Sequence, residues 1–337
     1  MIYEHVEFHN VAAIAETGGG VAMQRVPETV RRALNPGAQE QMLRPASGEI
    51  RFAATPGQAV EVTLSSTGSL RVSPFFGDFQ YASGIDVGPK PVRITLGWNP
   101  RLVDHLDEIL KHKLRFHPYV VRLLMGGDPV RFHGVTGAGI RPPRAEELPA
   151  LRYMAYGTSI THGHSASAPH LTYAAQTARH LGVDLLNFGV AGSCHCEPEL
   201  ADYLAGREDW DIASLALSVN MMEFSETEFE KRVRYFVHTV AGADARRPVA
   251  CVTLFRYFGD LHTRDEVHPT EKVGRFRQIV RDAVADCPTP NAHLVEGPDI
   301  LADLTGLSPD LIHPADNGMI DMGRNLAAAM QPLLSAP

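Results

Sequence analysis

The stretch Tyr156-Gly157-Thr158-Ser159-Ile160-Thr161-His162-Gly163 decides how the second half of this chain folds. It closes an apolar run, Leu151 to Tyr156, and then places a small hydroxyl residue on a glycine-flanked turn. This order is typical of a buried strand that turns sharply into a helix, a geometry that exposes a serine oxygen above a sheet. Ser159 is therefore the first candidate for chemistry, provided that other strand ends supply the partners that a nucleophilic serine needs.

Beyond this stretch, apolar runs and amphipathic segments alternate. Such alternation predicts an α/β fold, a doubly wound parallel sheet with right-handed crossovers and helices on both faces. In that architecture ligands bind beyond the carboxyl ends of the strands. The predicted strands cover 151–156, 183–188, 212–219, 249–255 and 292–296, and the predicted helices cover 171–181, 229–241, 271–286 and about 316–334.

The first half of the chain has a different spacing of apolar residues. Short segments alternate apolar and polar residues, as in Val60, Val62 and Leu64, and turn dipeptides separate several of them. Many short strands without helices between them predict an all-β sandwich or jelly roll. The exception is 101–113, whose apolar spacing predicts one helix. The predicted strands are 49–53, 59–64, 70–75, 91–96, 119–124 and 130–135.

Residues 141–149 separate the two patterns. Their three prolines and several charges cannot pair in a central sheet, so we interpret them as an interdomain connector. A length of 337 residues also exceeds the range over which one core keeps growing. We expect a β-sandwich or jelly-roll domain over 1–140, a linker over 141–149 and a catalytic domain over 150–337.

Composition excludes several function classes. A net charge of −8 with both signs interspersed argues against a nucleic-acid surface, which would be basic. No run of about 18 apolar residues is present to cross a membrane. The first residues lack the basic and apolar regions of a signal peptide, so we expect a cytoplasmic protein.

Cys194-His195-Cys196 invites a metal interpretation, because His162, His164 and His170 lie nearby in the sequence. Zinc ligands usually come in pairs two to four residues apart, and here one residue separates the cysteines and no second pair follows. We therefore favour buried thiols over a metal site. The four cysteines are also too few for a disulfide framework.

The other strand ends carry groups that acyl-transfer chemistry uses. Gly192 permits close backbone approach and offers an N–H, and Asn220 offers a side-chain amide. His313, just before the last helix, can remove a serine proton, and Asp310 can fix its tautomer. Singly, these residues also fit ordinary roles: a helix cap for Ser159, turn residues for the others. For His162 and His164 we favour packing or substrate contact.

In four blocks the chain resembles the SGNH hydrolases, also called GDSL-like esterases. The resemblance implies that Ser159 is the nucleophile, Gly192 and Asn220 are oxyanion donors, His313 is the base and Asp310 its orienting partner. It also implies that no metal or organic cofactor is needed. The blocks are Gly157-Thr158-Ser159-Ile160-Thr161-His162-Gly163, Asn187-Phe188-Gly189-Val190-Ala191-Gly192-Ser193, Leu217-Ser218-Val219-Asn220-Met221 and Asp310-Leu311-Ile312-His313-Pro314.

Two positions depart from the commonest family pattern. Ser218-Val219 stands where many members have glycine before the asparagine, and Ala191-Gly192-Ser193 stands where many have Ser-Gly-Asn. Neither change removes a required catalytic group. A narrower resemblance, through Gly77-Asp78-Phe79-Gln80 and Arg141-Pro142-Pro143, connects the chain to the two-domain branch with carbohydrate acetylesterase-like and natural-product acyltransferase-like members.

Three functions follow from these resemblances. The first is an esterase that hydrolyses an O-acyl or acetyl ester of a carbohydrate or small molecule through an acyl-serine. The second is an acyltransferase that moves an acyl group from a thioester or ester to a hydroxyl of a natural product. The third is a carbohydrate-binding protein with an inactive hydrolase domain. The sequence leaves open the acyl chain, the alcohol, the role of the first domain and the oligomeric state.

Overall fold

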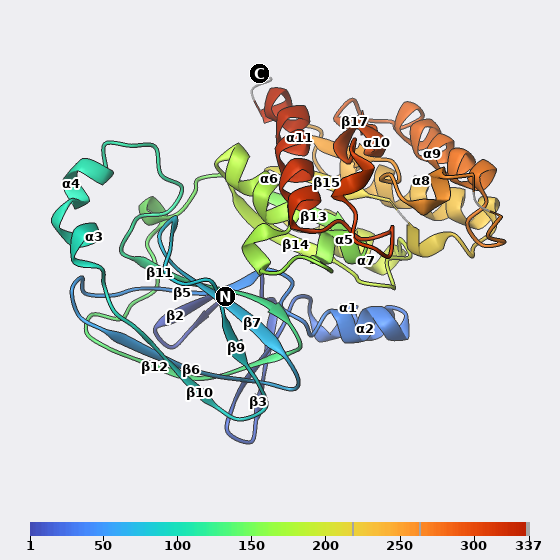
Figure 1. The fold of residues 1–337 in the computed structure, drawn as a ribbon. Helices are drawn as coiled ribbons and strands as arrows, with labels where there is room; N and C mark the ends of the chain where they lie inside the picture. Colours follow the sequence, from blue (N-terminus) through green and yellow to red (C-terminus); the bar gives the residue numbers. More distant parts are fainter. Residues whose placement is uncertain (218, 263, 335–337) are drawn as a thin grey trace.

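The computed structural model describes residues 1–217, 219–262 and 264–334 and contains two domains (Figure 1). Strands β1 to β12, within residues 2–136, form the β domain, and the chain from residue 152 onward forms the α/β domain. Ser218, which belongs to the third sequence block, lies outside the described residues. The fold class predicted from the sequence is confirmed.

The β domain is a sandwich of two antiparallel sheets. One sheet has the order β1-β2-β5-β11-β7-β8 with β9 also on β7, and the other has the order β10-β6-β12-β4-β3. Inward positions such as Val60, Val62 and Leu64 are fully buried between them, as the alternation requires. The strands are β1 Ile2–Tyr3, β2 Val6–His9, β3 Ala13–Thr17, β4 Gly20–Gln24, β5 Gly48–Ala53, β6 Val60–Ser66, β7 Leu70–Phe76, β8 Phe79–Gln80, β9 Ile85–Val87, β10 Val92–Leu96, β11 Val120–Gly127 and β12 Val130–Thr136.

One predicted element of this domain is wrong. The helix expected over 101–113 is instead two short helices, α3 (Pro100–Asp104) and α4 (Leu106–Ile109). The break is at His105, whose φ of −108° and ψ of 14° leave the helical range. Neither helix buries a residue, so no packing surface keeps the segment as one straight helix. The sequence analysis also missed two helices that follow β4, α1 (Glu28–Ala33) and α2 (Pro36–Gln41).

The α/β domain is a parallel sheet of order β14-β13-β15-β16-β17 between two helical layers. Helices α6 and α11 pack on one face, and α7, α8 and α9 pack on the other. Strands β15 and β16 end three residues earlier than predicted, and helix α7 was not predicted. The elements are β13 Arg152–Gly157, α5 Ser159–His162, α6 Tyr173–Leu181, β14 Asp184–Gly189, α7 Pro198–Ala205, β15 Ile212–Ala216, α8 Glu226–Gly242, β16 Val249–Val252, α9 Thr270–Ala285, β17 Ala292–Val295, α10 Gly297–Ile300 and α11 Asp316–Leu334.

The β domain covers the edge of this parallel sheet. Strand β14 is at the edge, and its outward carbonyls would otherwise be free to pair with another chain. His9 Nε2 lies 2.6 Å from the carbonyl oxygen of Leu185. The side chain of Asn10 donates to Asn187 O at 2.8 Å, and Arg25 donates to the same oxygen at 3.1 Å. Side chains of the β domain therefore satisfy the outer edge of β14.

A buried ion network ties the two domains together. Arg51 is fully buried on β5 and donates to both carboxylate oxygens of Asp184, each at 2.6 Å, and to Glu49 at 2.7 Å. Arg122 also donates to Glu49, at 2.6 and 2.8 Å. Although burial alone would raise the pKa of Glu49, the charges of Arg122 and Arg51 lower it to about 2. Removing one member of this network would leave a buried charge unpaired at the domain interface, which is strongly destabilising.

Among the described residues, no helix is both long and apolar enough to cross a membrane.

Candidate active site

Ser159 begins helix α5 directly after the carboxyl end of β13. Thr158 is the N-cap, and its hydroxyl accepts the N–H of Ile160 at 3.4 Å. As the first helical residue, Ser159 has an N–H without an acceptor inside the helix. The end of β14 runs close beside this turn, because a Cβ at Gly189 would lie 2.2 Å from the backbone nitrogen of His162. Only glycine fits at that position, so the turn of Ser159 and the second sequence block are packed together.

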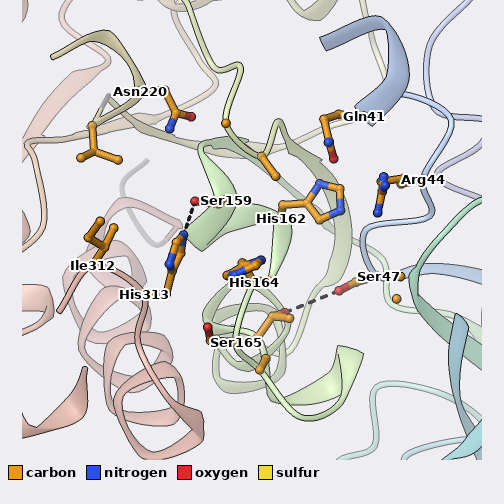
Figure 2. A pocket seen from close by; sticks show the side chains of 18 of the residues that line it. Gln41, Arg44, Ser47, Ser159, His162, His164, Ser165, Asn220, Ile312 and His313 are labelled. Atoms are coloured by element: carbon orange, nitrogen blue, oxygen red, sulfur yellow. Dashed lines mark hydrogen bonds between the residues drawn. The ribbon is translucent and has the colours of Figure 1, made fainter. Parts of the chain in front are cut away.

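His313 and Asp310 complete a hydrogen-bonded chain with the serine. Ser159 Oγ lies 2.8 Å from His313 Nε2 (Figure 2). His313 Nδ1 lies 2.7 Å from Asp310 Oδ2. A carboxylate accepts, so Nδ1 carries the proton and Nε2 is left to accept the proton of the serine hydroxyl. The structure therefore brings these three predicted residues within hydrogen-bond reach, in the order that proton transfer requires.

The carboxylate of Asp310 is fixed by its own loop. Its Oδ1 accepts the backbone N–H groups of Ile312 and His313, at 2.8 and 2.9 Å, and the hydroxyl of Ser308 at 2.9 Å. Burial acts to raise the pKa of Asp310, but these bonds and the one from the His313 ring outweigh it and lower the pKa well below its usual range. Asp310 is therefore a carboxylate at neutral pH.

Gly192 and Asn220 face the same cleft as the serine. Gly192 has a φ of +68°, the left-handed region that favours glycine, and a Cβ there would touch nothing within 4 Å. Asn220 lies in the 3₁₀ turn Val219–Met221, and its Oδ1 accepts the N–H of Cys194 at 3.3 Å. With the oxygen engaged, the Nδ2 group is the part of the side chain available to a substrate oxygen.

Two further histidines line the cleft. His162 Nδ1 donates to Gly189 O at 3.1 Å, and burial, helped by the charge of Arg25, lowers the pKa of His162 to about 3. Its ring is thus neutral, with Nε2 unprotonated. His164 lies against His313 with ring centroids 4.2 Å apart and the planes tilted by 51°. Burial and His313 lower the pKa of His164 as well. These contacts fit packing and substrate contact.

The cleft has a volume of about 1010 Å³ and runs between the two domains. Figure 2 shows Ile312 and His313 on one side of Ser159, and Gln41, Arg44 and Ser47 across the cleft. The α/β domain supplies the apolar side chains Val219, Met222, Phe224, Val267 and Ile312 to one part of the wall, with Glu223 and His268 among them. The β domain supplies polar ones, namely Gln41, Arg44, Ser47, Ser69 and Arg71.

The sequence analysis missed every β-domain residue of the cleft. Arg44 pairs with Asp128 at 2.9 Å and Arg71 with Asp86 at 2.7 Å, so each is held at the cleft by a partner far away in the sequence. No spacing motif marks such residues. For Gln41 the one available signal was chemical, the polar run Gln39-Glu40-Gln41 in a segment with no strand pattern, whereas Arg71 stands at a polar position of the predicted strand 70–75.

Cys194 and Cys196 are fully buried, which confirms the interpretation as buried thiols. Cys196 donates its backbone N–H to the hydroxyl of Tyr156 at 3.1 Å. The neighbouring Cys194 and burial raise the pKa of the Cys196 thiol well above its usual value. Within the described ranges, no group of three or more His, Cys, Asp or Glu side chains is arranged to hold a metal ion.

The sequence profile of the GDSL-like lipase/acylhydrolase family matches residues 152–333, more than half of the chain. The chain belongs to this family. It is therefore an enzyme, either a GDSL-like serine hydrolase or a related acyltransferase. No curated protein sequence matches the chain.

Solved structures resemble both domains together. A salicylyl-acyltransferase, SsfX3, from a tetracycline biosynthetic pathway has a TM-score of 0.78 at 17% identity, over 96% of this chain and 95% of that one. A GDSL-like lipase described as putative, from Bacteroides ovatus, has a TM-score of 0.69 at 17% identity over 98% of both chains. A family two carbohydrate esterase from Clostridium thermocellum has a TM-score of 0.63 at 14% identity, again over 98% of both. At these identities the likeness establishes the two-domain fold.

Proposed function

We propose that this GDSL-like enzyme is a serine esterase that hydrolyses an acyl ester of a carbohydrate or small molecule through an acyl-serine. The observation that carries the proposal is the chain of hydrogen bonds from Ser159 through His313 to Asp310, 2.8 and 2.7 Å long. Its serine and imidazole line the interdomain cleft. A serine becomes nucleophilic when a base can take its proton, and the base must be held in one tautomer.

In the first step Ser159 Oγ attacks the ester carbonyl while its proton moves to His313 Nε2. The carbonyl π electrons move to oxygen, and the resulting oxyanion is held by the N–H groups of Ser159 and Gly192 and by Asn220 Nδ2. When the tetrahedral intermediate collapses, the bond to the leaving oxygen breaks and His313 returns the proton to it. The alcohol departs and an acyl-serine remains.

In the second step water takes the place of the alcohol. His313 removes a proton from the water, the hydroxide oxygen bonds to the acyl carbon, and the same three donors hold the second oxyanion. Collapse releases the carboxylic acid and returns the proton to Ser159. Throughout both steps the ionised Asp310 stabilises the imidazolium of His313.

The two kinds of wall in the cleft suggest how a substrate lies in it. An acyl chain gains free energy by leaving water for the apolar side near Ile312, roughly 0.8 kcal/mol for each buried methylene. A hydroxyl-rich alcohol portion is better matched by the β-domain side, where Gln41, Arg44 and Ser47 offer hydrogen bonds. This orientation is consistent with a polar alcohol carrying a small or medium acyl group.

Acyl transfer is the second candidate, because the β-domain side of the cleft can hold a hydroxyl acceptor as well as a leaving alcohol. The donor would then be an ester or thioester, and an acceptor hydroxyl would replace water in the second step. Similarity to the salicylyl-acyltransferase over both domains supports this candidate. The third possibility, an inactive carbohydrate-binding protein, is disfavoured by the connected Ser159, His313 and Asp310.

The proposal is tested by active-site labelling and turnover. A fluorophosphonate probe is expected to label the wild type and not Ser159→Ala, and His313→Ala is expected to lose p-nitrophenol release from short acyl esters by about 10⁴-fold or more. Equal labelling of wild type and Ser159→Ala would remove Ser159 as the nucleophile. Product analysis with and without added hydroxyl acceptors separates hydrolysis from transfer, and transfer with negligible hydrolysis would favour the acyltransferase.

A further inference from the structure

The loop that carries Gly192, residues 190–197, is held by the β domain as well as by its own domain. It joins the edge strand β14 to helix α7 and lies against the segment 25–44, which contains α1 and α2. Figure 1 shows α1 and α2 projecting from the sandwich toward the α/β domain. The contacts between this segment and the loop are specific hydrogen bonds.

Arg25 fixes the start of the loop. Its guanidinium is buried and donates to Gly189 O at 3.0 Å and to Asn187 O at 3.1 Å. On the β-domain side it donates to the carbonyls of Gln41 and Arg44, at 2.7 and 2.8 Å. Burial among carbonyls lowers the pKa of Arg25 to about 9. One planar cation thus joins the end of β14 to the segment that follows α2.

Asn35 fixes the part of the loop beyond Gly192. Its Nδ2 donates to the carbonyl of Ser193 at 3.1 Å, contacts His195 Nδ1 at 3.3 Å and donates to the carboxylate of Glu197. Its backbone N–H donates to the same carboxylate at 3.2 Å. The Oδ1 atom accepts the N–H of Ala38 at 3.0 Å and so caps α2. The side chain therefore anchors both its own helix and the loop opposite.

The contact between α2 and the loop is also sterically close. A Cβ at Gly37 would lie 2.1 Å from Ser193 Oγ and 3.2 Å from Ser193 Cβ. On the other side of the loop, the N–H of Cys194 donates to Asn220 Oδ1. The two residues after Gly192 are thus held between them, Ser193 against α2 and Cys194 against the turn of Asn220.

We infer that Asn35 is a positioning residue for the oxyanion hole, so that the β domain takes part in catalysis by holding Gly192 and Asn220 in place. An oxyanion donor works only when it lies about 2.7–3.1 Å from the developing charge. Gly192 itself has no side chain to restrain it, and its left-handed backbone is open to solvent. The fixed carbonyl of Ser193 next to it supplies the restraint. This inference rests on the proposed function, because it takes Gly192 to be an oxyanion donor.

The experiment compares Asn35→Ala with Asn10→Ala. Each variant removes a hydrogen bond that an asparagine Nδ2 donates across the domain interface. Asn35→Ala removes the bond to Ser193 O, and Asn10→Ala removes the bond to Asn187 O at 2.8 Å. Only the first touches the loop of Gly192. For a p-nitrophenyl ester we expect Asn35→Ala to lose kcat by about ten- to a hundredfold with little change in KM, and Asn10→Ala to stay within about twofold of wild type.

A second readout separates positioning from stability. A boronic acid that forms a tetrahedral adduct with Ser159 is expected to bind Asn35→Ala more weakly by the same factor as kcat falls, because both report the oxyanion hole. Glu197 is buried, and it loses the side-chain amide bond in this variant. If Asn35→Ala folds poorly because of this unpaired carboxylate, the double variant Asn35→Ala/Glu197→Gln removes the charge. The double variant is expected to show the same loss of kcat as Asn35→Ala.

The outcomes distinguish the inference from the proposed function. If the wild type is not labelled at Ser159 by a fluorophosphonate, the proposed function fails and the inference fails with it. If the wild type is labelled but Asn35→Ala and the double variant turn over like Asn10→Ala, the role of Asn35 alone is overturned. A fall in kcat matched by weaker boronate binding, and absent in Asn10→Ala, supports it.

Discussion

The two sides of Ser159 are supported over very different distances in the sequence. On one side, Asp310 orients His313 across three residues and accepts the N–H groups of its own turn. On the other, Asn35 holds the loop of Gly192 across 158 residues, and Arg25 holds the end of β14 across 164. The base is thus built by a local turn, whereas the proposed oxyanion donors depend on a second domain. One active site thus combines a local half, Asp310 and His313, with a borrowed half, Gly192 and Asn220, which residues of the other domain support.

The largest effect expected in this comparison comes from the local half. In Asp310→Asn the amide can present a donor where His313 Nδ1 needs an acceptor, so the ring loses its productive tautomer. We expect kcat/KM for a p-nitrophenyl ester to fall by about 10⁴-fold. Ser308→Ala is the matched control, because it removes one bond to Oδ1 and leaves the bond from His313 to Oδ2. A loss below about tenfold in Asp310→Asn would show that the imidazole is oriented by other groups.

Asp310→Asn is also expected to change how the free energy of unfolding depends on pH. The pKa of Asp310 is lowered in the folded protein, so its carboxylate contributes stability that is fully present above its ordinary value of 3.8. That contribution is lost only as the pH falls from this value toward the lower folded pKa. The part of the unfolding free energy that wild type gains from this carboxylate over Asp310→Asn is therefore expected to shrink as the pH falls below about 4. A difference in unfolding free energy that does not shrink below pH 4 would contradict this assignment.

The local half is also the half that the sequence could predict. The spacing of Asp310 and His313 places both on one turn, and strand-to-helix alternation places Ser159 at a strand end. The same alternation also places Gly192 and Asn220 of the other half at strand ends, but not the β-domain residues that support them. Local hydrogen bonds decide these positions, so a short motif carries them. The predicted ends of β15 and β16 were three residues too long, because apolar residues continue past the last paired strand residue into the core.

The β-domain residues that support the borrowed half left no such signal. Asn35 lies between two short helices of six residues each, too short for a hydrophobic period to mark them. Its role depends on which loop the folded chain brings opposite, and that is fixed by the Arg51–Asp184 network and the capped edge of β14. Long-range polar pairs of this kind have no fixed spacing. For the same reason, the sequence did not predict that Arg44 and Arg71 line the β-domain side of the cleft.

A smaller effect is expected where the two halves meet, at Asn220. Asn220→Ala removes both the proposed oxyanion donor and the acceptor of the Cys194 N–H, and we expect kcat to fall by about 10²- to 10³-fold. Asn220→Asp separates these tasks, since a carboxylate still accepts from Cys194 and cannot donate to an oxyanion. We expect Asn220→Asp to lose at least as much kcat as Asn220→Ala. Recovery of near wild-type kcat in Asn220→Asp would assign the residue to loop anchoring alone.

The smallest effect, and the sharpest test of the borrowed half, is a steric one at Gly37. The methyl group added in Gly37→Ala would overlap Ser193 Oγ and push the loop of Gly192 away from α2. We therefore expect kcat to fall by about three- to tenfold with KM little changed.

Ser193→Ala removes the oxygen that the methyl would meet, leaving a Cβ contact of 3.2 Å that a small shift can relieve. The double variant Gly37→Ala/Ser193→Ala should therefore recover most of the lost kcat. Recovery of this kind shows that the two positions are coupled. An unchanged unfolding midpoint in Gly37→Ala then assigns the loss of kcat to the loop rather than to folding. If the two losses simply add, the loss in Gly37→Ala does not come from the contact with Ser193, and the support from the β domain is a matter of folding rather than of the oxyanion hole.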